Sequence, residues 1–170
     1  SENGLIVPGT DSFDLADEVE ALFDFYGALA EENGVTLRLE GSGQVTGDRL
    51  MLRRAIGNLL SNALRYTPSG GRIVVTVSVV RDSTDTETVH LAVENTGDPI
   101  PPEHLSRLFD RFYRVDASRR HSGDGAGLGL AITRSILRSH GGDIEGRTGK
   151  GCNIFEMWIP TSIVTPRSAD

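Results

Sequence analysis

Three stretches of the chain repeat apolar residues with the spacing of a helix. The first covers residues 13–34, and its apolar side chains share one face because they recur every three or four positions. Asn33 and Gly34 then give a stop signal. The apolar positions of this face are Leu15, Val19, Leu22, Phe23 and Tyr26.

The second helical stretch follows Asp48, whose short carboxylate suits an N-cap, and ends before the turn-forming residues 68–71. A third runs over residues 127–142, and a short helix with proline in its first turn is expected over 101–109. The positions that we expect the second helix to bury are Leu50, Leu52, Ile56, Leu59, Leu60 and Leu64.

Alternating apolar and polar residues predict strands between these helices. Residues 35–41 form one, and residues 72–80 and 89–95 predict an antiparallel hairpin around a polar tip. Residues 142–149 and 152–160 predict a second hairpin. Helices and strands mix without strict alternation, which indicates an α/β sandwich with a mixed sheet.

The length of 170 residues suits one well-cored domain, which we place at residues 13–160. Residues 1–12 are expected to be a flexible segment and 161–170 a tail. The chain begins with Ser1 rather than Met, which suggests a piece of a larger protein. Its start lacks the pattern of a signal peptide, and no apolar run approaches the roughly 20 residues that span a bilayer.

Charge and cysteine content narrow the functional classes. The net charge of −7 argues against nucleic acid as a partner, although residues 107–121 gather five arginines. The single Cys152 excludes an intramolecular disulfide and a Cys-rich metal site, and the four scattered histidines give no zinc spacing.

Four alternating glycines stand in the segment GDGAGLGLAI, residues 123–132, directly before a helical pattern. Glycine is costly in ordered structure, so a close backbone approach to phosphate at a helix N-terminus is one explanation, and a mobile loop is the other. The spacing fits neither the P-loop nor the dinucleotide fingerprint.

Asn58, Asn62 and Arg65 share one face of the second helix. Burying amides on a leucine-rich helix is costly without partners. They either cap neighbouring backbone or sit at the solvent edge, or an amide oxygen helps to hold Mg²⁺ between phosphates.

Taken in order, four segments resemble the motif boxes of sensor histidine kinases. NLLSNALRYTPSGG resembles the N box, ENTGDPI the first glycine box, LFDRFYR the F box and GAGLGLAI the second glycine box. The resemblance covers residues 13–160. It implies the Bergerat ATP-binding fold, with a mixed, mostly antiparallel sheet covered by about three helices. It also implies ATP and Mg²⁺ as cofactors and an ATP lid over roughly residues 112–126.

The resemblance assigns roles by position. Asn58 is the Mg²⁺ ligand, Asn62 and Arg65 support the phosphates, and Tyr66 packs on adenine or, alternatively, closes the helix onto the core. Phe109 and Phe112 anchor the lid. The implied ATP-binding residues are Asn58, Asn62, Arg65, Tyr66, Asn95, Gly97, Ile100, Phe112, Arg114, Gly125, Gly127, Leu128, Gly129 and Leu130.

Two departures from the wider family are informative. Asn95 stands where most sensor kinases have the Asp that accepts from the adenine amino group, and Asn can still accept through its carbonyl oxygen. With the residues that follow, it resembles the heavy-metal-responsive subgroup. Arg54 occupies the position of the general base in ATP-hydrolysing relatives, so we expect intrinsic hydrolysis to be slow. This favours a phosphoryl transferase over an ATPase.

None of His90, His104, His121 and His140 is followed by an acidic residue, as a phosphoacceptor of the family is. The resemblance therefore places the acceptor on a separate dimerisation domain and expects this chain, a monomer, not to phosphorylate itself. The full protein is expected to be an inner-membrane homodimer with this domain in the cytoplasm, passing phosphate to a response regulator. Two alternatives stay open: a stand-alone serine kinase of the anti-sigma type, and a degenerate module that binds nucleotide or a partner.

Overall fold

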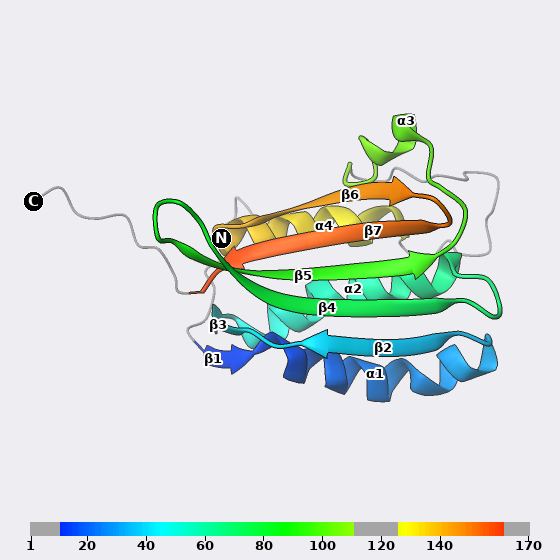
Figure 1. Cartoon of the computed structure of the whole chain (residues 1–170), viewed down its shortest axis with the longest axis horizontal. Coiled ribbons are helices and arrows are strands. Elements are labelled where there is room, and N and C mark those ends of the chain that lie inside the picture. The colour runs from blue at the N-terminus through cyan, green and yellow to red at the C-terminus, as the bar shows by residue number, and fades with distance from the viewer. Residues whose placement is uncertain (1–10, 111–125, 162–170) are drawn as a thin grey trace, which may run out of the picture.

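A computed structural model describes residues 11–110 and 126–161 of the chain (Figure 1). Helices and strands follow one another without strict alternation, as the patterns predict. The elements are β1 (Asp11–Asp14), α1 (Leu15–Glu32), β2 (Thr36–Gly41), β3 (Gln44–Gly47), α2 (Arg49–Tyr66), β4 (Arg72–Arg81), β5 (Glu87–Thr96), α3 (Pro102–Leu105), α4 (Ala126–Ser139), β6 (Asp143–Gly149) and β7 (Cys152–Pro160).

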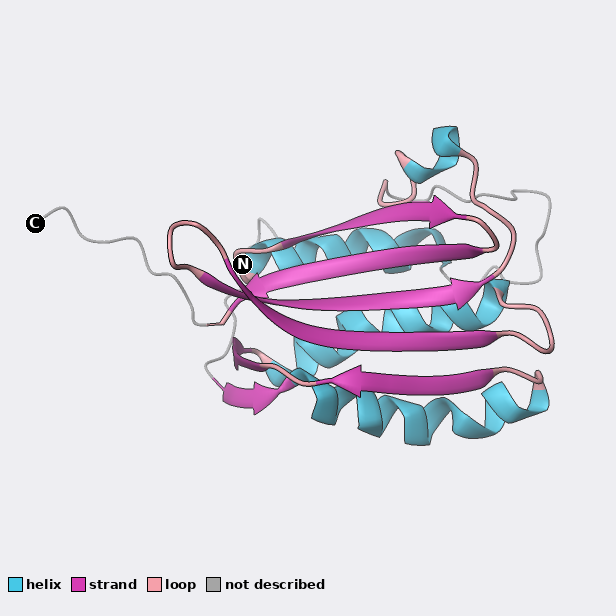
Figure 2. Cartoon of the chain, in the orientation of Figure 1, coloured by secondary structure: helices cyan, strands magenta, loops and turns pink. Residues whose placement is uncertain are grey.

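Two layers make up the molecule, a five-stranded sheet and a layer of helices. The strand order is β2-β4-β5-β7-β6, in which β2 and β4 are parallel and every other pair is antiparallel. Helices α1, α2 and α4 lie on the same face of this sheet (Figure 2). The predicted sandwich, with a mixed and mostly antiparallel sheet, is confirmed.

A second, two-stranded sheet was not predicted. β1 and β3 pair antiparallel, with Asp11 opposite Gly47 and Ser12 opposite Thr46. β1 therefore begins at Asp11, two residues before the predicted domain start at 13. Each strand has only four residues and few apolar positions, so their alternation is too short to be read from the chain.

The core lies between the sheet and helices, and it corrects one prediction for α2. Leu52 is fully buried, whereas Leu50 is 73% exposed. Residues two positions apart on a helix point in nearly opposite directions, so a helix that buries Leu52 turns Leu50 to solvent. The other predicted positions of this helix, Ile56, Leu59, Leu60 and Leu64, are all buried.

Buried charge joins α1 to the start of α2. Glu18 is 2% exposed, and its two carboxylate oxygens pair with Arg49 at 2.9 Å and Arg53 at 2.8 Å. The guanidinium of Arg49 also lies 4.8 Å from the ring centre of Phe13. A buried carboxylate needs such partners, so this cluster fixes α2 against α1.

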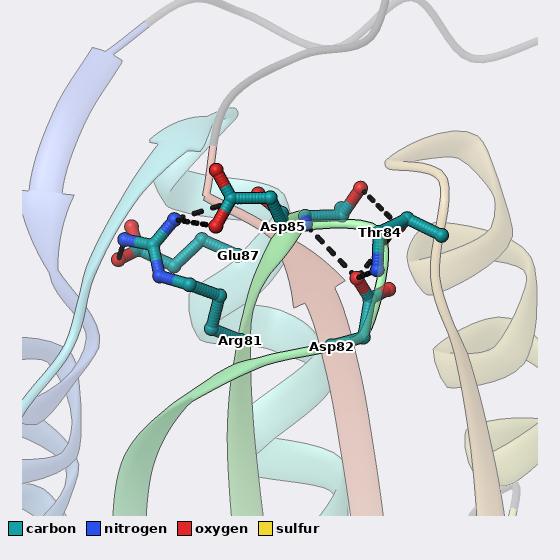
Figure 3. Close-up of polar contacts among 6 residues, drawn as sticks. Arg81, Asp82, Thr84, Asp85 and Glu87 are labelled. Carbon is teal, nitrogen blue, oxygen red and sulfur yellow. Dashed lines mark hydrogen bonds and ion pairs between the residues drawn. The ribbon is translucent and has the colours of Figure 1, made fainter.

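Polar contacts hold the tip of the β4–β5 hairpin, at the opposite end of the sheet from the start of α4 (Figures 1 and 3). Asp82 accepts hydrogen bonds from the Thr84 hydroxyl and from the backbone N–H groups of Thr84 and Thr86, which lower the pKa of its carboxyl. Arg81 pairs with Asp85 and Glu87 at 3.1 and 2.8 Å. The side-chain acceptor of Asp82 closes the turn.

Candidate functional site

Three segments far apart in sequence meet at one end of the sheet. They are the C-terminal half of α2, the loop after β5 and the start of α4 (Figure 1). Because α4 packs antiparallel beside α2, its first turn lies against the middle of that helix. The resemblance assigns nucleotide contacts to these same segments.

Asn58 is oriented by two acceptors on α4. Its Nδ2 donates to the Gly129 carbonyl oxygen at 3.1 Å and to the Thr133 Oγ1 at 3.2 Å. Thr133 is fully buried, and its hydroxyl proton is donated to backbone carbonyl oxygens, the nearest that of Gly129 at 3.0 Å, so Oγ1 can only accept from Asn58. Both protons of the amide are thus used by protein, and its Oδ1 has no hydrogen-bond partner among the described residues.

The nitrogen and the oxygen of the Asn58 amide each agree with one of the two interpretations of this residue. The nitrogen binds neighbouring backbone, as the structural alternative expected. The oxygen, a hard donor of the kind that Mg²⁺ prefers, remains available at the half-buried edge of α2. The donor therefore fits a cation that bridges phosphates.

The start of α4 supplies the second component of the site. The helix begins at Ala126, so Gly127, Leu128 and Gly129 lie in its first turn, where backbone N–H groups have no partner inside the helix. A β-carbon on Gly129 would lie 3.8 Å from the Cγ of Asn58, an ordinary contact. Leu130 is buried in the core. Phe112, Arg114 and Gly125, with the lid, lie outside the described residues.

The other end of the α2–α4 pair is held by a histidine. The backbone N–H of Asp48, the N-cap of α2, donates to the Nε2 of His140 at 3.0 Å. The Nδ1 of His140 lies 2.9 Å from the Ile136 carbonyl oxygen. The ring is therefore the tautomer with its proton on Nδ1, buried and structural.

Along α2 beyond Asn58, the face turns toward solvent. Asn62 and Arg65 are half-buried, and Tyr66 is 41% exposed. That exposure argues against the alternative in which Tyr66 closes the helix onto the core. The phosphate role of Asn62 and Arg65 and the adenine role of Tyr66 stay predictions.

Asn95, the penultimate residue of β5, lies on the helix-covered face and is 3% exposed. Its Nδ2 donates to the Thr96 carbonyl oxygen at 3.0 Å, and its Oδ1 has no hydrogen-bond partner within the described part of the chain. None of the buried side-chain polar atoms there lacks a partner, so this oxygen is not fully buried and can accept from a ligand.

Gly97 brings the loop after β5 against the end of α2. A β-carbon there would lie 3.0 Å from the Tyr66 carbonyl oxygen and 3.2 Å from the Asn95 Nδ2. The loop therefore lies close to the backbone at the end of α2, and the nucleotide-binding role of Gly97 stays a prediction. Ile100, farther along the loop, is half-buried and packs against the core.

Asn153 was missed by the sequence analysis although it lies beside these residues. It pairs with Asn95 in the β5–β7 register and is 2% exposed. Its Nδ2 donates to the Asp98 carbonyl oxygen at 2.8 Å, and its Oδ1 accepts from the Ile100 N–H at 3.1 Å. The sequence signal that could have identified Asn153 was a polar amide at an inward position of the alternating strand, in line with Phe155 and Met157.

Aromatic contacts support the segment that precedes the lid. Phe109 is partly buried, and its ring meets that of Phe155 edge to face at 6.1 Å. The guanidinium of Arg134 lies 5.3 Å from the centre of the Phe109 ring. The expected anchoring role of Phe109 therefore has a packed partner on β7.

Two further findings concern metal and membrane. Within residues 11–110 and 126–161, no three His, Cys, Asp or Glu side chains come together as a metal site. No helix in those ranges combines the length and apolar character needed to cross a bilayer.

Comparison with known proteins places these observations in a family. Residues 47–163 match the profile described as "Histidine kinase-, DNA gyrase B-, and HSP90-like ATPase". The chain is 55% identical over 161 residues to "Sensor histidine kinase CusS" of Escherichia coli strain K12, which covers 94% of this chain and 32% of that protein. The chain thus spans about a third of the length of this relative.

Two solved structures show the same fold. "ShkA full-length in complex with AMPPNP" matches with a TM-score of 0.77 at 22% identity, covering 96% of this chain and 33% of that one. "Histidine kinase ThkA (TM1359) in complex with response regulator protein TrrA (TM1360)" matches with a TM-score of 0.73 at 24% identity, covering 89% and 42%. The predicted resemblance to sensor histidine kinases, and to their heavy-metal-responsive subgroup, is confirmed.

Proposed function

Because the chain belongs to the family of histidine kinase-, DNA gyrase B- and HSP90-like ATPases, we propose that it is the catalytic domain of a sensor histidine kinase. It binds Mg·ATP and presents the γ-phosphate to a histidine on a separate dimeric helical domain. The phosphate then passes to a response regulator, a class of partner that ThkA binds in its solved complex. In the intact protein the domain lies on the cytoplasmic side of the inner membrane.

The orientation of Asn58 is the observation that carries this proposal. Thr133 and the Gly129 carbonyl oxygen take both amide protons, so the oxygen faces away from α4. That oxygen would hold Mg²⁺ when the nucleotide is bound. When bound, the cation neutralises phosphate charge.

The phosphate groups themselves are bound by the start of α4. N–H groups in the first turn of this helix point outward along its axis, and the helix dipole favours negative charge there. The helix is 14 residues long and is fixed against α2 at both ends, so the donors are held in place. Arg65, which stands near the end of α2, adds a cation.

The base is recognised at the end of β5. The Asn95 Oδ1 accepts a hydrogen bond from the adenine amino group, and the Asn95 Nδ2 stays bound to the Thr96 carbonyl oxygen. The half-buried Ile100 lines the apolar side of the base pocket.

Chemistry in this domain is positioning with charge neutralisation. Arg54 lies one helical turn before Asn58, exposed, and an arginine cannot take a proton from water. Transfer to a histidine is therefore favoured over hydrolysis. Two of the four histidines are engaged within the described part of the fold: His140 is bound at both ring nitrogens, and the Nδ1 of His90 pairs with Glu156 at 2.8 Å.

Calorimetric titration with ADP and a non-hydrolysable ATP analogue, with and without Mg²⁺, tests the proposal. We expect saturable binding that Mg²⁺ strengthens for the triphosphate and that Asn58→Ala weakens. Leu50→Ala is the matched control on α2, because this side chain is 73% exposed. Absence of binding at millimolar nucleotide would leave the degenerate alternative as the better account.

Transfer itself needs the acceptor. The chain is mixed with radiolabelled ATP and the separately produced helical domain of the same protein. Label on a histidine of that domain is the expected result. Label on serine of an added protein, or no label despite nucleotide binding, would contradict the kinase assignment.

A further inference from the structure

We propose that Asn153 is a positioning residue for the base end of the nucleotide, acting through the backbone of residues 97–100. The inference rests on the proposed function, because it concerns how that same site holds adenine. It assigns a role to the residue of β7 that pairs with Asn95 in the sheet register.

Three hydrogen bonds among the described residues join the backbone of this loop to the β6–β7 hairpin. The Gly97 N–H donates to the Gly151 carbonyl oxygen at 3.0 Å. Asn153 binds two backbone groups farther along the loop. Its amide donates to the Asp98 carbonyl oxygen at 2.8 Å and accepts from the Ile100 N–H at 3.1 Å. A single side chain thus bridges two backbone groups of one short loop.

Thr148 on β6 fixes the orientation of that amide. Its hydroxyl lies 2.7 Å from the Asn153 Oδ1 and 3.3 Å from the Cys152 carbonyl oxygen, and its single proton is donated to one of these two oxygens. The shorter contact favours Asn153. The Ile100 N–H cannot face an amide nitrogen, so the oxygen of Asn153 must point toward the loop's later residues.

The hydrogen-bonding capacity of Asn153 is therefore directed at protein, with its side chain 2% exposed. Asn95, its register partner, has an oxygen that no described residue binds. The two amides have different roles. Asn95 is placed to bind the base, and Asn153 holds the loop whose Ile100 forms the pocket wall.

The buried surroundings of position 153 do not by themselves explain an amide there. Phe155, Met157 and Ile159 occupy the other inward positions of β7 and are almost fully buried. An apolar residue at 153 would extend this series but would leave the Asp98 carbonyl oxygen and the Ile100 N–H without their partner. The amide is explained by what the loop requires.

The experiment measures ADP affinity by calorimetry for the wild-type chain, Asn153→Ala, Thr148→Val and Thr148→Ser, with thermal unfolding of each. We expect Asn153→Ala to weaken ADP binding about tenfold and Thr148→Val by a smaller factor. Thr148→Ser keeps the hydroxyl and restores wild-type affinity. Ile159→Val is the control, since it removes buried apolar volume from the other end of the same strand.

A second measurement reads the loop directly. Amide hydrogen exchange at Ile100 should accelerate in Asn153→Ala and in Thr148→Val, and remain at the wild-type rate in Ile159→Val. If Asn153→Ala and Thr148→Val bind ADP as tightly as the Ile159→Val control, the positioning role is wrong. If the wild-type chain itself does not bind ADP, the proposed function fails first and this inference fails with it.

Discussion

Asn58 on α2 and Thr133 on α4 are joined by a 3.2 Å hydrogen bond in which the amide nitrogen must be the donor. Thr133 uses its one proton for backbone carbonyl oxygens, so its Oγ1 has only lone pairs to offer. The contact between two helices thereby determines which atom of Asn58 faces the proposed nucleotide site.

Replacing Thr133 tests that relationship. Thr133→Val keeps the shape but removes one of the two acceptors that orient the amide, so only the Gly129 carbonyl oxygen still holds it. We expect the affinity for the Mg²⁺ complex of an ATP analogue to fall by about 1 kcal/mol, the net value of one hydrogen bond. Thr133→Ser retains the hydroxyl and should bind like the wild type. Equal affinity of the two variants would show that Asn58 is oriented by other contacts.

Asn95 should contribute directly to nucleotide affinity. Asn95→Ala removes the oxygen that we assign to the adenine amino group, and the predicted loss is at least about 1 kcal/mol of binding free energy for ADP. Asn95→Asp keeps an acceptor at the same place and serves as the comparison. Unchanged affinity in Asn95→Ala, measured by calorimetry, would mean that adenine is recognised elsewhere.

Glu18 should be among the more important charges for stability. Glu18→Ala leaves Arg49 and Arg53 facing each other without their buried carboxylate. Both arginines are partly exposed and can be rehydrated, so we expect a loss of about 2 kcal/mol, below the value for a fully buried pair. Glu20→Ala, an exposed position on the same helix, should change the free energy of unfolding by less than about 0.5 kcal/mol. Similar losses in the two variants would contradict the structural role of this cluster.

Truncation of two leucines of α2 should lower the free energy of unfolding by very different amounts. Leu52→Ala removes fully buried volume and should cost about 2–5 kcal/mol in denaturant unfolding. Leu50→Ala alters a side chain that is 73% exposed and should stay within about 0.5 kcal/mol of the wild type. A large loss in Leu50→Ala would mean that this side chain is covered in the folded chain.

Asp143 predicts a dependence of stability on pH. Burial raises the pKa of this carboxyl, but hydrogen bonds from the Ile144 N–H and from Arg134 and Arg138 outweigh burial and lower it. Because the folded pKa lies below the unfolded one, the ionised form stabilises the fold near neutral pH. The contribution is lost as pH falls from the ordinary aspartate value through the lowered one.

The measurement for Asp143 compares thermal unfolding of wild type and Asp143→Asn as the pH is lowered. The partly exposed pair should be worth no more than about 1 kcal/mol near neutral pH. The difference between the two proteins should shrink as the solution is acidified below the aspartate range. A constant difference over that range would exclude ionisation of Asp143 as its source.

Much of the fold could be predicted from local pattern, because helices and strands repeat their buried positions with different periods. The spacing of leucines identified α2, the Asp48 carboxylate identified its start, and two alternating runs identified the β4–β5 hairpin. The order of four motif boxes identified the family. The first three signals are each contained in a short run of residues, the last is the order of four such runs, and all were confirmed.

Contacts between distant segments were decided only by the tertiary structure. The β1–β3 pair, the burial of Glu18 by arginines of another helix, and the inward amide of Asn153 depend on partners more than 25 residues away. A sequence shows that Asn58 and Thr133 are polar residues on apolar helices, but not that they meet. The reason is physical: hydrogen-bond direction is set by which donors and acceptors the packed helices bring within reach, whereas periodicity records only which side of an element is buried.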